Sequence, residues 1–274
     1  MDYKELRMLQ LEELKMFKEI AKICEKYGLT YYALGGTLLG AVRHEGFIPW
    51  DDDLDIGFKR DDYEKFLKIA KKEFSEPYSI VHVNNNKKYI YPYARIENSN
   101  IKLCREFTKN KTVQNLWVDI FPLDGAPSGK VKRFFWEKHI FILRGLRNLS
   151  CFDELVNITK EYHGIKKIIV QIGLKTNISS LLNTHKILLK LDKYLKKWKL
   201  ADNSCIGNPM GGSWFKEVYP KEYYKKIVKL KFEDTTINCP VAYKKILTQM
   251  YGDYMTPPDE KDRNKHGTSI VFKK

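Results

Sequence analysis

The chain has 274 residues, of which 43% are hydrophobic and 30% charged, and its formal net charge is +15. This balance is typical of a folded globular protein and excludes an intrinsically disordered one. No run of about twenty apolar residues occurs, so no membrane-spanning helix is expected. The first residues lack the apolar core of a signal peptide, and we therefore expect a cytoplasmic location.

The five cysteines are scattered without a Cys-x-x-Cys pair, which predicts neither a zinc site nor a disulfide framework. The lysine excess has two interpretations. One is codon usage in an AT-rich genome, and the other is attraction to nucleotides, teichoic-acid-like polymers or an anionic membrane face. Because no nucleic-acid-binding module is recognised, we do not expect a nucleic-acid partner.

A phosphate-binding turn is predicted near the start of the chain. Apolar residues recur at helical spacing over residues 4–27. Residues 29–34 then read as a strand, and Gly35 and Gly36 form a turn where a bare backbone can approach a ligand closely. Thr37 is expected to cap the following short helix, whose free N-terminal amides favour an anion.

Four aspartates crowd the next segment. Two carboxylates at ~4 Å repel each other by about 4 kcal/mol at an effective dielectric near 20, so the group needs a cation, amide donors or water. Apolar residues alternate with Asp53 and Asp55, which indicates a half-buried strand with both carboxylates on one face. Such a pair suits Mg²⁺. The aspartates are Asp51, Asp52, Asp53 and Asp55.

The middle of the chain is predicted to alternate between helix and strand. Asp61 or Asp62 is expected to cap a helix that ends before Pro77. Residues 78–105 read as short strands, with a turn at residues 98–100. Arg95 alternates with apolar neighbours, and on the metal side of the sheet it would steady a diphosphate.

A second apolar strand contains Asp119 between Val118 and Ile120. An unpaired carboxylate is costly in such a setting, so Asp119 is a candidate functional residue. Asp124 precedes Gly125 and is expected to be a turn residue.

The composition changes over residues 128–200. Aromatic and basic residues mix over residues 128–200, with helices expected near 165–174 and 187–198. This mixture fits either ordinary helix packing or contact with a membrane surface. A strand and turn are expected near 228–234, followed by a helix from Pro240 that Gly252 closes.

The unbroken string from Gly35 to Ile56 resembles the LicD family, whose members are similar to fukutin and fukutin-related protein, and residues 251–258 resemble that family's closing motif. The resemblance implies an α+β fold: a nucleotidyltransferase-like mixed sheet flanked by helices, with an added helical subdomain. It places a catalytic core at residues 1–127, the helical subdomain at 128–205 and a C-terminal segment at 206–274 that packs back on the core.

The same resemblance implies a phosphotransferase that moves phosphocholine, or a related alcohol phosphate, from CDP-choline or another CDP-alcohol to a cell-surface glycan. Teichoic acid, lipopolysaccharide and capsule are the expected acceptors, and peripheral contact with the inner membrane face is expected. Mg²⁺, with Mn²⁺ as the alternative, would be held by Asp53, Asp55 and Asp119, which are also the expected catalytic residues. Donor phosphates would be held by Gly35, Gly36, Thr37, Arg43, His44 and Arg95.

Several alternatives remain open from the residues alone. The chain could be a nucleotidyltransferase that leaves NMP on its acceptor, or a non-catalytic polyanion-binding module. Trp50 would either wall a cationic choline head by cation–π contact or anchor a turn. Asp51 and Asp52 would extend the metal site or lie in water, and His266 would contact substrate or lie in a basic tail. The alcohol, the acceptor and the oligomeric state are not indicated.

Overall fold

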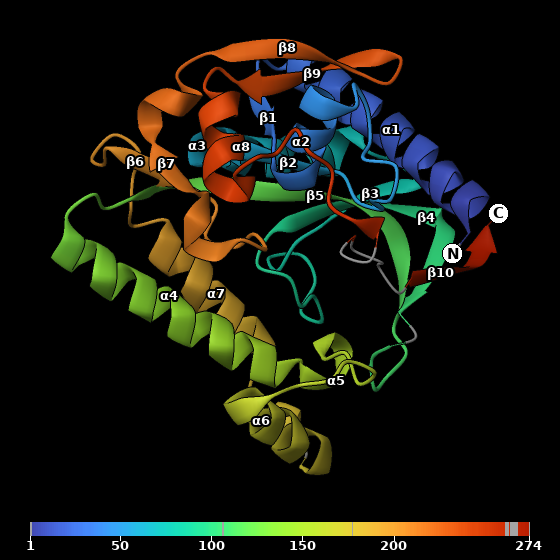
Figure 1. Ribbon diagram of the computed structural model, residues 1–274, viewed down its shortest axis with the longest axis vertical. Helices are drawn as coiled ribbons and strands as arrows, with labels where there is room; N and C mark the ends of the chain where they lie inside the picture. The colour runs from blue at the N-terminus through green and yellow to red at the C-terminus, as the bar shows by residue number, and fades with distance from the viewer. Residues whose placement is uncertain (1, 106, 177, 261–262, 264–267, 274) are drawn as a thin grey trace.

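A computed structural model describes residues 2–105, 107–176, 178–260, 263 and 268–273 (Figure 1). Its α-helices are α1 Tyr3–Lys26, α2 Gly35–Arg43, α3 Arg60–Glu73, α4 Lys130–Ser150, α5 Phe152–Leu155, α6 Gly164–Lys175, α7 Thr184–Leu195 and α8 Tyr243–Tyr251. Its strands are β1 Tyr31–Ala33, β2 Asp55–Lys59, β3 Tyr78–Val81, β4 Ala94–Arg105, β5 Val113–Ala126, β6 Cys205–Gly207, β7 Val218–Pro220, β8 Ile227–Phe232, β9 Thr235–Pro240 and β10 Thr268–Lys273. The expected α+β class is confirmed.

A mixed sheet forms the centre of the molecule. Its main path runs β1-β2-β5-β4-β10, with β3 on β4 and the β6–β7 pair on the end of β5. The β2–β5 pair is parallel, whereas β1–β2 and β4–β5 are antiparallel. A separate β8–β9 hairpin lies over β1 (Figure 1). Sequence-distant β2 and β5 are therefore neighbours at the middle of the sheet.

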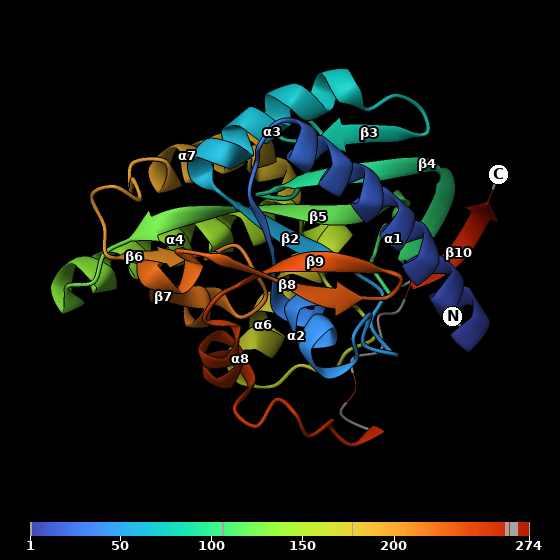
Figure 2. The same cartoon turned by 90° about the horizontal axis from the view of Figure 1, so that it is seen from above.

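Helices cover the sheet because their apolar stripes meet its buried face. In α1, residues such as Leu9, Phe17 and Ile20 are fully buried, and the helix packs on β5. Helix α3 packs on β2, β3 and β5 and presents Tyr63 and Phe66 to the core. Figure 2 shows α1 and α3 crossing the strands side by side. This packing holds the two central strands in place.

Several local predictions are wrong. The strand expected to carry both Asp53 and Asp55 begins only at Asp55. Pro240 ends β9 and does not open a helix, since α8 begins at Tyr243. Thr37 does not cap α2, which begins at Gly35 with Leu34 as its N-cap, so the glycine pair belongs to the first helical turn. Asp61 and Asp62 do not cap α3, because the helix begins one residue earlier at Arg60 and they occupy its first turn. Residues 98–100 make no turn between two strands. They lie in β4, which runs on through a bulge.

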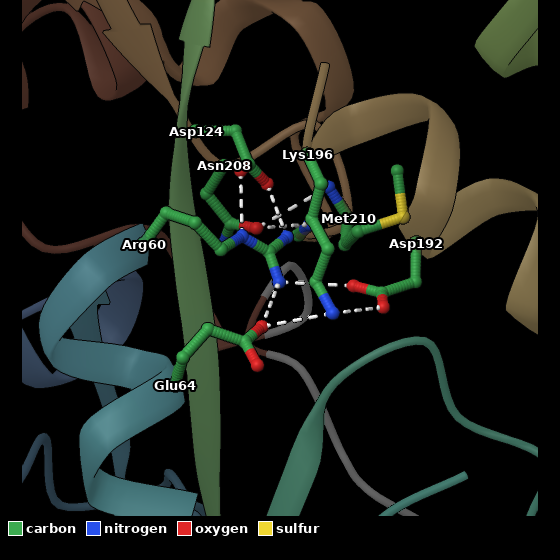
Figure 3. A network of polar contacts seen from close by, with 8 residues as sticks. Arg60, Glu64, Asp124, Asp192, Lys196, Asn208 and Met210 are labelled. Atoms are coloured by element: carbon green, nitrogen blue, oxygen red, sulfur yellow. Dashed lines mark hydrogen bonds and ion pairs between the residues drawn. The ribbon is translucent and has the colours of Figure 1, made fainter. Parts of the chain in front are cut away.

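Asp124 is also not a turn residue. It lies inside β5, is buried, and its carboxylate accepts hydrogen bonds from Arg60 Nε and Nη2 at 2.7 and 2.6 Å. Arg60 Nη1 donates to Asp192 of α7 at 2.9 Å and to Glu64 at 3.2 Å, and Lys196 bridges the same two acids (Figure 3). The network ties α3, β5 and α7 together.

The segment after β5 is helical, as expected. Helices α4 and α7 pack against each other, and Trp136, Ile140 and Leu143 turn into the core. The chain then returns to the sheet, since β6 pairs with the end of β5. No helix in the described ranges is long and apolar enough to cross a bilayer. The three domain boundaries stay a prediction.

Candidate active site

Two aspartates stand side by side on the central strands. Asp55 begins β2 and is the register partner of Asp119 in the parallel strand β5. The Asp119 backbone N–H donates to the Leu54 carbonyl at 3.0 Å, which extends the ladder toward Asp53. Backbone pairing therefore brings together the three carboxylates that the sequence singled out.

Asp55 is held in place but its charge is not balanced. Its backbone N–H donates to Thr37 Oγ1 at 2.8 Å, so this hydroxyl clamps α2 to β2. The Asp55 Oδ1 atom is enclosed and has no hydrogen-bond partner among the described residues. Burial, followed by the charges of Asp53 and Asp119, raises the pKa of Asp55 well above its usual range. A carboxylate with these properties fits a bound cation.

A cavity of about 590 Å³ opens beside Asp55. We call it the glycine cavity, because the two loops Gly35–Gly36 and Gly211–Gly212 both line it. Asp51, Asp53 and Asp55 also lie in its wall, whereas Asp52, Thr37 and His44 do not. Its size is within the range of small-molecule sites.

The first glycine pair is required by close packing against the acids. Gly35 has φ +49°, in the left-handed region that favours glycine. A Cβ on Gly36 would lie 2.4 Å from Asp51 Oδ2. The positive end of α2 thus faces the carboxylates, which lowers the free-energy cost of gathering them.

Cationic side chains lie across the same cavity. Arg43 Nη1 donates to the Tyr254 carbonyl at 2.9 Å, and Arg43 Nε donates to His44 Nε2 at 2.9 Å. The Trp50 ring has Arg263 at 4.2 Å and Arg43 at 5.9 Å from its centroid. Trp50 is therefore already engaged by two guanidinium groups, which favours its anchoring role over a choline contact. His44 positions Arg43 and does not reach the cavity.

Sequence reasoning missed Glu217, which lies in the wall of the glycine cavity at the end of a short 3-10 helix. Its carboxylate accepts hydrogen bonds from the Ser213 backbone N–H at 3.0 Å and from Asn208 Nδ2 at 3.1 Å. Burial raises the pKa of Glu217 to about 7. The Gly211–Gly212 pair is the local sequence feature that marks this loop.

Asp119 faces a second cavity, of about 350 Å³, that we call the aromatic cavity. Its wall also includes Asp52 and Asp53, so Asp53 lies in both cavities. Arg95 is buried there and donates through Nε to Asp119 Oδ1 at 2.7 Å. Arg95 thus lies with Asp53, on the side of the sheet where it was expected, but it lines the aromatic cavity and not the glycine cavity. The aromatic members are Tyr91, Tyr93, Phe107 and Trp117.

No three acid, histidine or cysteine side chains of the described ranges are arranged as metal ligands. Of the three predicted ligands, Asp53 and Asp55 line the glycine cavity, whereas Asp119 forms an ion pair with Arg95. Two carboxylates suffice for Mg²⁺ where substrate phosphates supply further oxygens. Mg²⁺ binding stays a prediction, and the Asp53–Asp55 pair fits it. His266 lies outside the described residues.

Comparison with known proteins decides the family. Over 266 residues, 95% of each chain, this chain is 33% identical to the lipopolysaccharide cholinephosphotransferase LicD of Haemophilus influenzae. Residues 28–143 match the profile described as LicD/FKTN/FKRP, nucleotidyltransferase domain. This chain belongs to the LicD family. It is thus a transferase of the LicD type.

Other relatives of this LicD family member match shorter stretches. An uncharacterized Rickettsia typhi protein, RT0683, is 33% identical over 153 residues, which cover 54% of this chain and 44% of that protein. The human ribitol 5-phosphate transferase FKRP is 42% identical over 53 residues, 18% of this chain and 11% of FKRP. The groups that these relatives are named for transferring thus differ, while the family is shared.

Proposed function

We propose that this chain is a Mg²⁺-dependent phosphocholine transferase that uses CDP-choline and a hydroxyl of a lipopolysaccharide, teichoic acid or capsular glycan. The observation that carries the proposal is the likeness, over nearly the whole chain, to a lipopolysaccharide cholinephosphotransferase. The site geometry supports a two-substrate reaction, because Asp53 lines two cavities.

The glycine cavity is the proposed donor site. Asp53 and Asp55 would hold the ion, and the α2 N-terminus would face the diphosphate, as helix N-termini often do. Arg43 and Arg263 supply positive charge at its mouth. A bound Mg²⁺ would neutralise charge on the diphosphate and on the departing CMP.

The reaction is an in-line displacement at the phosphorus that carries choline. The acceptor oxygen forms a bond to that phosphorus while the bond to the bridging oxygen breaks, and CMP leaves with the bridging oxygen. The acceptor proton passes to Asp119, which lies in the aromatic cavity and is oriented by Arg95. Such chemistry depends on positioning and charge neutralisation and needs no covalent nucleophile.

Contact with a membrane face is part of the proposal. Helix α4 leaves a row of large apolar side chains exposed among basic residues, and α6 does the same on the same lower side of Figure 1. Basic amphipathic surfaces of this kind bind anionic bilayers. The exposed side chains are Val131, Phe134, Phe135, Phe141 and Ile142 of α4, and Ile168, Ile169, Ile172 and Leu174 of α6.

Thermal stabilisation tests the donor. The purified protein is heated with CDP-choline, CDP-ethanolamine, CDP-glycerol, CDP-ribitol or nucleoside triphosphates, each with and without Mg²⁺. Binding to the folded state raises Tm with ligand concentration. A selective, Mg²⁺-dependent shift with CDP-choline is expected. A shift with another CDP-alcohol would reassign the alcohol, and a shift with triphosphates alone would replace the proposal with nucleotidyl transfer.

A further inference from the structure

The aromatic cavity shares Asp53 with the glycine cavity. Its wall includes the carboxylates of Asp53 and Asp119 and the side chains of Arg95 and Arg105. Arg95 and Arg105 come from the two ends of β4, which curves through its bulge. The cavity therefore combines the reactive carboxylates with two cations.

The two arginines are not equivalent. Arg95 is almost fully buried and is bound on both sides, through Nε to Asp119 at 2.7 Å and through Nη1 to Gln114 Oε1 at 3.1 Å. Its guanidinium also stacks 3.5 Å from the Tyr91 centroid. Its charge is thus matched by that of Asp119.

Arg105 is half-buried, and its guanidinium has only ring contacts among the described residues. It lies 5.4 Å from the Trp117 centroid and 5.9 Å from the Tyr91 centroid. No carboxylate of the described ranges forms an ion pair with it. A guanidinium that rests on ring faces keeps its donors available and suits a carboxylate or phosphate.

The cavity volume limits the ligand. About 350 Å³ is near the lower end for small-molecule sites, which suits one sugar unit and not an oligosaccharide. Tyr91 and Trp117 offer ring surface for a sugar face, and the carboxylates of Asp53 and Asp119 accept hydrogen bonds from hydroxyl groups. A free hydroxyl would therefore lie toward Asp119, and a negative group toward Arg105.

We propose that the aromatic cavity is the acceptor site and takes one sugar unit that bears a phosphate or carboxylate, which pairs with Arg105. This inference rests on the proposed function, because it assumes that the second cavity holds the second substrate. The negative charge on the sugar, and not the sugar ring alone, then determines which acceptor binds.

The test measures sugar binding without turnover. Glucose 6-phosphate, glucuronate and glucose are titrated into the full chain at constant ionic strength, with ligand-observed NMR as the readout. The two charged sugars should bind about tenfold more tightly than glucose, as one charged hydrogen-bonded pair allows. Arg105→Ala should reduce that preference to within about twofold, and Arg105→Lys should keep part of it.

A matched control separates this pairing from the general positive charge of the protein. Arg43→Ala removes a cation from the glycine cavity. It should weaken the binding of CDP-choline and leave the preference for charged sugars unchanged. Equal binding of all three sugars, no binding at millimolar concentration, or a preference that survives Arg105→Ala would overturn the inference. Circular dichroism confirms that each variant is folded.

The two proposals fail in different ways. If CDP-choline and its relatives do not bind, the proposed function is wrong whatever the sugars do. If CDP-choline binds and Arg105→Ala has no effect on sugar preference, the donor assignment stands and the acceptor assignment is wrong.

Discussion

Asp55 and Asp119 are register partners across the two central parallel strands, although 64 residues separate them in the chain. Parallel pairing aligns their backbones, and burial together with nearby carboxylates raises the pKa of Asp55. The metal-free site is therefore electrostatically unfavourable, and relief of that repulsion is a measurable property.

Asp55→Asn should abolish transfer and stabilise the metal-free protein. Loss of a ligand should lower kcat by at least about 10³-fold, since metal-ion stabilisation amounts to several kcal/mol. Removal of a buried charge should raise the free energy of unfolding at pH 8, because ionisation of Asp55 is unfavourable in the folded protein. Urea unfolding with EDTA present measures this, with exposed Asp61→Asn on α3 as the control. Near-normal turnover would contradict the ligand role.

Glu217 should make stability fall as pH rises. Its folded-state pKa of about 7 lies above its usual value of 4.5, so the folded protein binds a proton that the unfolded chain releases. The stabilisation is complete below pH 4.5 and is lost by about pH 7. Glu217→Gln removes the titration, so wild type should lose up to about 3 kcal/mol relative to the variant between pH 4.5 and 8. Parallel curves for the two proteins would contradict the raised pKa.

Gly36→Ala should weaken donor binding. The added Cβ would displace the Asp51 carboxylate, which lies 2.4 Å from its position. We expect Kd for CDP-choline with Mg²⁺ to rise by about tenfold or more, because the acid cluster and the α2 N-terminus must both shift. Gly145→Ala in α4 is the control, since nothing lies within 4 Å of its Cβ. That helical change should slightly stabilise the fold and leave binding unchanged.

Arg60→Met should destabilise the whole protein. It leaves Asp124, whose side chain is only 1% exposed, without its cation. Removal of one partner from a buried ion pair costs about 3–5 kcal/mol. Urea unfolding should show this loss, whereas Lys68→Met, at an exposed position on the same helix, should change stability by less than about 0.5 kcal/mol. Pairing Arg60→Met with Asp124→Leu should recover much of the loss.

Removal of exposed apolar side chains from α4 should weaken membrane binding. Phe134→Ser with Phe135→Ser should reduce co-sedimentation with vesicles of 70% phosphatidylcholine and 30% phosphatidylglycerol (roughly physiological anionic content). Burial of each ring in the interface contributes about 1.5–3 kcal/mol. Tyr3→Ser, at a residue 71% exposed on α1, is the control. A second copy of the chain as the occupant would instead appear as a dimer without vesicles.

The sequence predicted the acidic residues of the site better than the residues that tertiary pairing brings to its cavities. Alternation predicted a strand through Asp53 and Asp55, of which β2 includes only Asp55, and an acid between apolar residues singled out Asp119, because these signals depend on immediate neighbours. The contribution of Glu217 depends on β6 pairing with β5, which no local pattern encodes. The ion pair of Asp124 with Arg60 could not be predicted for the same reason, since the two residues are 64 positions apart in the chain.

The Arg60–Asp124 pair lies one step beyond Lys59 and Leu123, the last partners of the β2–β5 ladder. A slip of one residue would turn the side chains to the opposite face of the sheet and leave two buried charges without each other. The ion pair thus stabilises the correct register of the two parallel strands. Asp55 and Asp119 pair at the other end of the same ladder. The Arg60–Asp124 ion pair therefore fixes their register although it lies outside both cavities.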